Sequence, residues 1–266
     1  MKDTKNFIKF LGTGGARYVV SRQLRSSAGT WLNLKGKNIL IDPGPGTLVH
    51  CYASRPKLDP ANLDAIILTH RHLDHSSDLN VLIEAMTGGR LKKRGVLFIP
   101  SDAVNCDEPV VFKYLLEAVE RVEILREGGQ YSLGEVSFFT PVIHKHSVET
   151  YGLKFEAGDL DLSLIVDTAF FPELIEHYKS KIIILNVVLF KHPGADNVEH
   201  LDLDNCKEII RGIKPELALL THFGLTMLKN KPWLLAEEIS RETGVEVKAA
   251  GDGMMIKLDN YLKYKR

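Results

Sequence analysis

The sequence lacks the features that mark several classes of protein. Its three cysteines are scattered, with no Cys-x-x-Cys pair. An odd number of isolated cysteines favours reduced thiols over a disulfide scaffold or a thiolate zinc site, so we expect a cytoplasmic protein. The 34 basic residues balance the 34 acidic residues. No global charge therefore attracts nucleic acid or a membrane surface, and any site for a polyanion must be local.

Long apolar runs and linkers are also missing. No apolar stretch approaches the roughly 18 residues that a membrane span requires, and residues 1–6 lead directly into a strand-like segment. We therefore expect no signal peptide and no membrane partner. Neither repeats nor a Pro/Gly/Ser-rich linker divides the chain, and its 44% hydrophobic residues suffice for a sizeable core. The sequence predicts one domain over residues 1–266.

Short apolar runs alternate with helix-compatible stretches along the whole chain. The predicted strands cover residues 8–11, 31–34, 38–41, 65–68, 96–99, 136–143, 151–155, 162–166, 181–188, 217–220 and 245–258, the last interrupted by Gly251-Asp252-Gly253. The predicted helices, with apolar spacings of three and four, cover 76–86, 109–119, 172–179, 202–211 and 233–243. This alternation predicts an α/β fold in which two sheets lie between helices.

The densest group of ligand-type side chains is Thr69-His70-Arg71-His72-Leu73-Asp74-His75, directly after the apolar run 65–68. A single histidine in a sequence is usually structural, but three imidazoles and one carboxylate within six positions need a common explanation. A loop leaving a strand can turn His70 and His72 toward one point, and Asp74 and His75 toward a second. That arrangement suits two cations side by side.

Other ligand-type residues stand where further predicted strands end. They are Asp42, His144, His146, Asp167 and His222. Any one of them could be an ordinary turn or helix-capping residue. Because α/β sheets collect their functional loops at the carboxyl ends of strands, we expect this set to converge with the histidine-rich loop on one site.

Together these motifs resemble the metallo-β-lactamase-fold hydrolases, in particular the RNase Z and phosphodiesterase branch. The family's His-x-His-x-Asp-His motif stands here at residues 70–75, and the resemblance extends from Gly12-Thr13-Gly14-Gly15 to Gly251-Asp252-Gly253. It implies a four-layer αββα sandwich with two metal ions. By this similarity the first metal would be held by His70, His72 and His146, the second by Asp74, His75 and His222, and Asp167 would bridge the two. Asp42 would orient a ligand histidine from behind.

Two details of the resemblance refine the metal site. His146 is preferred over His144 as a ligand because its distance to the following strand resembles the His-x-Val-x-x-x-Gly-Tyr pattern of RNase Z; His144 is then a supporting, packed residue. Flavodiiron relatives resemble His-x-Glu-x-Asp-His, whereas this chain has His72 in place of the Glu. An all-histidine first site favours zinc, with manganese or mixed metals left open.

The expected chemistry is hydrolysis. Two neighbouring cations can share a hydroxide as nucleophile and stabilise charge on the oxygens of the electrophile. Asp74 and His200 are the predicted catalytic residues. His200 is the expected proton donor, because a similarly placed histidine serves the phosphodiesterase branches, although a helix-capping region could also hold it. We expect the substrate to be a small or cyclic phosphodiester, such as a nucleotide, or an RNA end.

Precursor tRNA is doubtful as a partner. RNase Z proteins carry a His-Glu-Ala-Thr motif where this chain has Asn186-Val187-Val188-Leu189, and no basic Gly/Pro-rich insertion is present. We read the basic run 90–94 as a solvated face. Arg25, Ser26 and Ser27, which follow the Gly-rich exit of the first strand, are the predicted substrate-binding residues, with a solvated surface loop as the other interpretation.

Other functions stay open at this point. The same metal centre would suit a thioester, lactone or β-lactam hydrolase. A non-enzymatic metal-binding scaffold is the third hypothesis, and the intact set of ligands argues against it. The sequence is also compatible with a homodimer.

Overall fold

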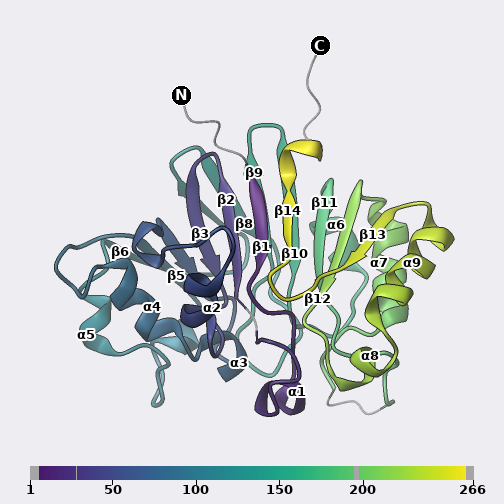
Figure 1. The fold of residues 1–266 in the computed structure, drawn as a ribbon, viewed down its shortest axis with the longest axis horizontal. Coiled ribbons are helices and arrows are strands. Elements are labelled where there is room, and N and C mark those ends of the chain that lie inside the picture. Colours follow the sequence, from purple (N-terminus) through teal and green to yellow (C-terminus); the bar gives the residue numbers. More distant parts are fainter. Residues whose placement is uncertain (1–5, 28, 195–197, 262–266) are drawn as a thin grey trace.

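Two seven-stranded sheets form the centre of the protein in a computed structural model that describes residues 6–27, 29–194 and 198–261 (Figure 1). The strands of the first sheet are β1 (Phe7–Phe10), β2 (Thr30–Leu34), β3 (Lys37–Ile41), β4 (Ala65–Ile67), β5 (Val96–Ile99), β6 (Arg121–Ile124) and β14 (Met255–Lys257). Those of the second are β7 (Gly129–Leu133), β8 (Val136–Thr140), β9 (Leu153–Ala157), β10 (Leu160–Ile165), β11 (Ile182–Asn186), β12 (Leu217–Thr221) and β13 (Glu246–Ala249).

Both sheets have the same pattern of strand pairing. The first has the order β14-β1-β2-β3-β4-β5-β6, antiparallel from β14 to β3 and parallel from β3 to β6. The second has the order β7-β8-β9-β10-β11-β12-β13, antiparallel up to β10 and parallel from there. In each sheet the parallel strands therefore end at one common edge, which is where α/β proteins collect functional loops.

Helices cover the outer face of each sheet (Figure 1). On the first sheet lie α2 (Thr47–Ala53), α4 (Leu79–Met86) and α5 (Lys113–Leu116), and on the second lie α6 (Glu173–His177), α7 (Leu203–Ile213) and α9 (Pro232–Thr243). The short helices α1 (Arg17–Ser21), α3 (Leu73–Ser76) and α8 (Leu225–Lys229) gather at the lower edge in Figure 1. No helix among the described residues is long and apolar enough to cross a membrane.

Alternating side chains of the central strands hold these layers together. In β11, Ile182 and Ile184 belong to the core between the sheets, whereas Ile183 and Leu185 pack under the outer helices. Successive strand residues point to opposite faces, so a strand buried on both faces reads as a continuous apolar run. The prediction of two sheets between helices is confirmed.

Several predicted elements have different bounds in the structure. The expected helix 76–86 is observed as α4, which begins only at Leu79, after the separate short helix α3; the expected helix 109–119 shrinks to α5. The backbone amides of Val110 and Phe112 bond to Ala103 and to the side chain of Asn80, so they are not free to continue a helix. Strands β6 and β7 and helices α1, α2 and α8 were not predicted.

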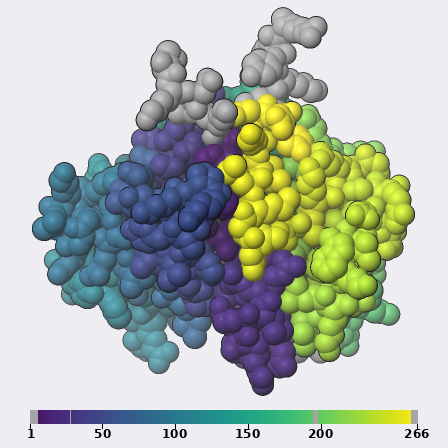
Figure 2. Space-filling model, viewed as in Figure 1, coloured from purple at the N-terminus to yellow at the C-terminus, as the bar shows by residue number. Residues whose placement is uncertain are grey.

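The predicted strand 245–258 consists of two strands that belong to different sheets. β13 is the edge of the second sheet, and β14 pairs with β1 in the first, with Phe7 opposite Lys257. In the space-filling view, the C-terminal segment (yellow) lies between the two halves of the molecule, beside the purple N-terminal part (Figure 2). The turn at residues 251–253 therefore carries the chain from one sheet to the other.

Candidate metal centre

Loops after the parallel strands of both sheets meet at one edge. Asp42 follows β3, and the histidine-rich loop runs from β4 into α3. From the second sheet, Asp167 follows β10 and His222 follows β12. The expectation that strand-end residues converge is thereby met.

His70, His72 and His146 form one group of ligand-type atoms, all within 4.8 Å of one another. His146 Nε2 lies 3.1 Å from His72 Nδ1. Four-coordinate zinc with Zn–N distances of about 2.0–2.1 Å places neighbouring ligand atoms about 3.3–3.4 Å apart, so the spacing suits a shared cation. His70 Nε2 is buried and has no hydrogen-bond partner. Since buried polar atoms normally have a partner, this nitrogen indicates a site for an additional group.

Asp74, His75 and His222 form a second group of the same kind. The Nε2 atoms of His75 and His222 are 3.3 Å apart, and Asp74 Oδ2 lies 3.7 Å and 3.5 Å from them, respectively. The donor set of this group, two imidazole nitrogens and one carboxylate oxygen, also fits zinc or a similar divalent cation.

Hydrogen bonds behind the histidines fix which ring nitrogen faces the centre. Asp42 accepts from the backbone N–H and from the hydroxyl of Thr69, both at 2.7 Å. The Thr69 hydroxyl has thus used its hydrogen, so it accepts from His70 Nδ1 at 3.1 Å. His70 Nε2 then carries a lone pair. Asp42 also accepts from His75 Nδ1 at 3.0 Å, so Nε2 is the nitrogen of His75 that faces the site.

Asp167 lies beside His75, from the first sheet's side, and His222, from the second sheet's side. Its Oδ1 accepts from Asn186 Nδ2 at 2.7 Å, while Oδ2 is 3.4 Å from His222 Nε2 and 3.7 Å from His75 Nε2. Although burial raises its pKa, the neighbouring His222 and His75 hold the pKa of Asp167 well below its usual range. The bridging role expected for this carboxylate stays a prediction.

His144 is buried behind Asp167, as expected of a supporting residue. Its Nδ1 lies 3.3 Å from the backbone carbonyl of Asp167, and its Nε2 is 3.0 Å from the hydroxyl of Tyr178. Burial lowers the pKa of His144 to about 4, so this ring is neutral near pH 7. Tyr178 and Asn186, which contact His144 and Asp167, were not predicted, because both lie in ordinary apolar segments without a motif.

Charges within the centre shift the remaining histidines in opposite directions. Burial, and then the neighbouring His75, lower the pKa of His70 well below its usual value. Burial also lowers the pKa of His75, but the carboxylates of Asp74 and Asp42 outweigh it and raise this pKa well above the usual value. Strongly opposed shifts among packed residues are typical of functional sites.

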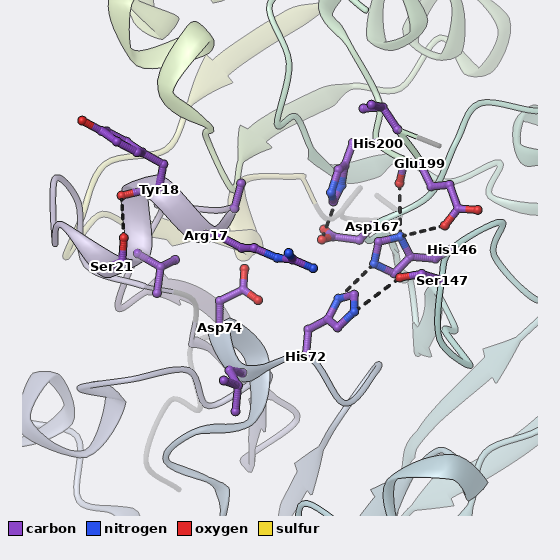
Figure 3. Close-up of a pocket in the computed structure, with 14 residues that line it drawn as sticks. Arg17, Tyr18, Ser21, His72, Asp74, His146, Ser147, Asp167, Glu199 and His200 are labelled. Carbon is purple, nitrogen blue, oxygen red and sulfur yellow. Dashed lines mark hydrogen bonds and ion pairs between the residues drawn. The ribbon is translucent and has the colours of Figure 1, made fainter. Parts of the chain in front are cut away.

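A cavity of about 920 Å³ opens onto the centre. Side chains of both groups reach it, together with residues of α1 and of the loop before α7 (Figure 3). The lining residues that bear on function are His72, Asp74, His146, Asp167, His200 and Arg17. The volume is in the range of small-molecule sites in enzymes.

His200 lies in the wall of this cavity. Its Nδ1 is 3.6 Å from Asp167 Oδ2 and is buried without a hydrogen bond, and burial lowers its pKa. The preceding residue, Glu199, accepts from His146 Nδ1 through its backbone carbonyl at 3.2 Å, which turns His146 Nε2 toward His72. The structure thus brings His200 within reach of the site, where its predicted role as proton donor is sterically feasible.

Arg25, Ser26 and Ser27, the predicted substrate-binding residues, do not line this cavity. Arg25 donates to Thr13 Oγ1 at 2.9 Å and lies over the ring of Phe223, and Ser27 is fully buried. The backbone N–H of Ser26 donates to Asp252 at 2.8 Å. Backbone pairing with Gly14 and the hydrogen bond to the Asp252 side chain hold this loop outside the cavity.

Comparison with known proteins decides the family. The sequence profile of the Beta-lactamase superfamily domain matches residues 37–223. The chain belongs to this superfamily. An uncharacterized protein of Methanocaldococcus jannaschii is 32% identical over 97% of both chains. Ribonuclease Z of Methanopyrus kandleri is 29% identical over 58% of this chain and 51% of its own length.

Solved structures agree with this assignment at the level of the fold. The metallo-beta-lactamase fold protein YhfI from Bacillus subtilis superimposes with a TM-score of 0.73 at 16% identity, covering 95% of this chain and 99% of that one. The αββα sandwich is therefore the metallo-β-lactamase fold. Its superfamily contains metal-dependent hydrolases whose fold binds two divalent metals. The all-histidine group and the group of Asp74, His75 and His222 lie at the edge where such a centre is expected.

Proposed function

We propose that this superfamily member is a dinuclear metal-dependent phosphodiesterase, with zinc as its metal. The observation that carries the proposal is the pair of ligand groups, with the buried, unpartnered Nε2 of His70 in one and the Nε2 atoms of His75 and His222 at 3.3 Å in the other. Divalent cations held there would supply an activated water and a positive charge for the oxygens of the electrophile.

The chain's own residues have distinct tasks in this reaction. Asp167 holds its charge between His75 and His222, and Asp42 keeps the ring of His75 in the orientation that exposes Nε2. Water attacks phosphorus, and Asp74 takes up the proton that the water loses. The bond from phosphorus to the leaving oxygen breaks, and His200 gives that oxygen a proton. The same residues would also hold manganese or a mixed pair of metal ions.

A small phosphodiester or an RNA end is the substrate class that we propose. The partial match to ribonuclease Z supports phosphodiester chemistry, and the cavity of about 920 Å³ has room for a nucleotide. A folded precursor tRNA is disfavoured, because the chain has no basic Gly/Pro-rich insertion to hold it.

Elemental analysis and a substrate panel test the proposal. We expect two equivalents of metal per chain and turnover of bis(p-nitrophenyl) phosphate that disappears after chelation and returns with zinc, manganese or cobalt. Faster cleavage of thioester, lactone or β-lactam substrates would show that the protein is an acyl hydrolase and not a phosphodiesterase. If two metals bind but no substrate of the panel is turned over, the protein is a metal-binding scaffold and not an enzyme of these classes.

A further inference from the structure

Helix α1 forms a wall of the cavity and contributes a positively charged side chain to it. Four of its residues line the cavity, and Arg17 extends from the helix toward Asp167, His72 and His146 (Figure 3). Among the described residues that line the cavity, Arg17 is the only lysine or arginine. None of the ion pairs between described residues involves Arg17, although carboxylates of the centre line the same space.

The segment before α1 fixes the helix against the metal centre. Gly15 donates its N–H to the backbone of Phe223 at 3.1 Å, and Phe223 donates to Thr13 at 2.8 Å. A Cβ at Gly15 would overlap the ring of His222, so the backbone passes directly over this ligand-type histidine. Ala16 then takes φ 63° and ψ 152°, a region that non-glycine residues rarely occupy.

This anchoring matters because it makes α1 a preorganised part of the site. A cation on a mobile loop would lose backbone entropy whenever it bound a ligand, whereas backbone pairing to Phe223, after β12, has already fixed the chain that carries Arg17. Arginine presents a planar fork of donors that matches two oxygens of a phosphate, and it is charged at every relevant pH.

We propose that Arg17 binds the anionic, non-bridging oxygens of a phosphodiester substrate and thereby selects an anionic substrate over a neutral ester. The inference deepens the proposed function and rests on it. Arg17 thus takes the phosphate-binding place that the sequence suggested for Arg25, and it does so from the opposite end of the same loop. The apolar mouth, where Leu73 is 75% exposed, accommodates the uncharged substituent of the ester.

The test compares Arg17→Gln and Arg17→Lys with the wild type on two substrates that share a leaving group. One is the anion bis(p-nitrophenyl) phosphate, and the other is the neutral triester dimethyl p-nitrophenyl phosphate. Losing a charge-assisted bidentate contact should lower kcat/KM for the diester about 10- to 100-fold, while the triester changes less than about twofold. Arg17→Lys should recover part of the loss, since lysine keeps the charge without the fork.

The control is Arg22→Gln, which removes an exposed arginine that follows the same helix and does not line the cavity. It should leave both substrates unaffected. Metal content and thermal unfolding of all variants are measured alongside, and both should match the wild type.

A binding measurement separates this inference from the proposed function. Dimethyl phosphate, which is not turned over on the timescale of calorimetry, should bind the zinc-loaded wild type about tenfold more tightly than Arg17→Gln. Equal binding, or an equal loss on diester and triester, overturns the role of Arg17. Absence of diester turnover in the wild type would overturn the proposed phosphodiesterase activity. The affinity for dimethyl phosphate would still decide whether Arg17 binds the phosphate anion.

Discussion

The two halves of the molecule contribute to the metal centre in different ways. The first sheet contributes His70, His72, Asp74 and His75 from a single segment that runs from the end of β4 into α3. The second contributes His146, Asp167, His200 and His222, each from a different segment. A short segment sets the geometry of the first group locally, whereas the second depends on how four segments far apart in the sequence pack together. The second half should therefore be the more sensitive to changes in its surroundings.

Asp167→Ala is expected to have the largest effect. It removes the buried carboxylate that lies beside both His75 and His222, so repulsion among the remaining groups and the lost ligand should reduce metal content and activity together, with turnover falling at least about 1000-fold. Elemental analysis and the diester assay measure the two losses. Asp159→Ala, in the exposed turn before β10, is the matched control and should behave like the wild type. Full activity in Asp167→Ala would refute the bridge.

His200→Ala should leave the metals bound but slow turnover. General-acid catalysis contributes roughly 100- to 10,000-fold when the leaving group is a poor one. We therefore expect a loss of about 100-fold for a nucleotide diester with an alcohol leaving group, and a much smaller loss for p-nitrophenolate, which leaves without a proton. The ratio of the two rates, with metal content as the control, measures the effect. An equal loss on both substrates would contradict proton donation.

Asp42→Asn tests the local half of the centre. The change keeps the size of the side chain but removes the negative charge that accepts from Thr69 and from His75. Losing such a partner typically weakens metal binding about 10- to 100-fold. Competition with a chelator followed by elemental analysis gives the affinity of each site. Unchanged affinity at both sites would mean that the loop orients its histidines without this carboxylate.

Gly15→Ala should have the smallest effect of the four substitutions, and it acts through His222, the ligand-type residue that the second half contributes to its site. A methyl group at this position must displace the ring of His222, so we expect weaker binding at the site of Asp74, His75 and His222 by about tenfold. The other site should be unchanged. Gly251→Ala is the control, since a Cβ there meets no atom within 4 Å. Equal weakening of both sites would show that the two sites are not independent.

The sequence predicted the local group more readily than the dispersed one, for a physical reason. Four ligand-type side chains in six positions are visible in the sequence itself, whereas Asp167 and His222 stand out only because each ends an apolar strand. Which arginine of the segment after β1 lines the cavity was not visible in the sequence. The pairing of Gly14 with Ser27 and Phe223 places Arg17 in the cavity wall and leaves Arg25 outside it.

The elements show the same division. Apolar periodicity predicted the buried strands and the longer helices α7 and α9, because packing of one face shapes their sequence. It missed the half-exposed β6 and the five-residue α1, whose positions depend on contacts with distant segments. It also merged β13 with β14, since an apolar run does not reveal which sheet a strand will join.

The pairing of β14 with β1 has a consequence for the order of events during synthesis. Strands β7 to β13 of the second sheet follow one another along the chain, so this sheet can assemble as its segments leave the ribosome. The first sheet cannot finish until Met255–Lys257 has emerged to cover the free edge of β1. The half whose metal ligands are encoded most locally is thus the last to be completed, and a nascent chain would carry an open strand edge until then.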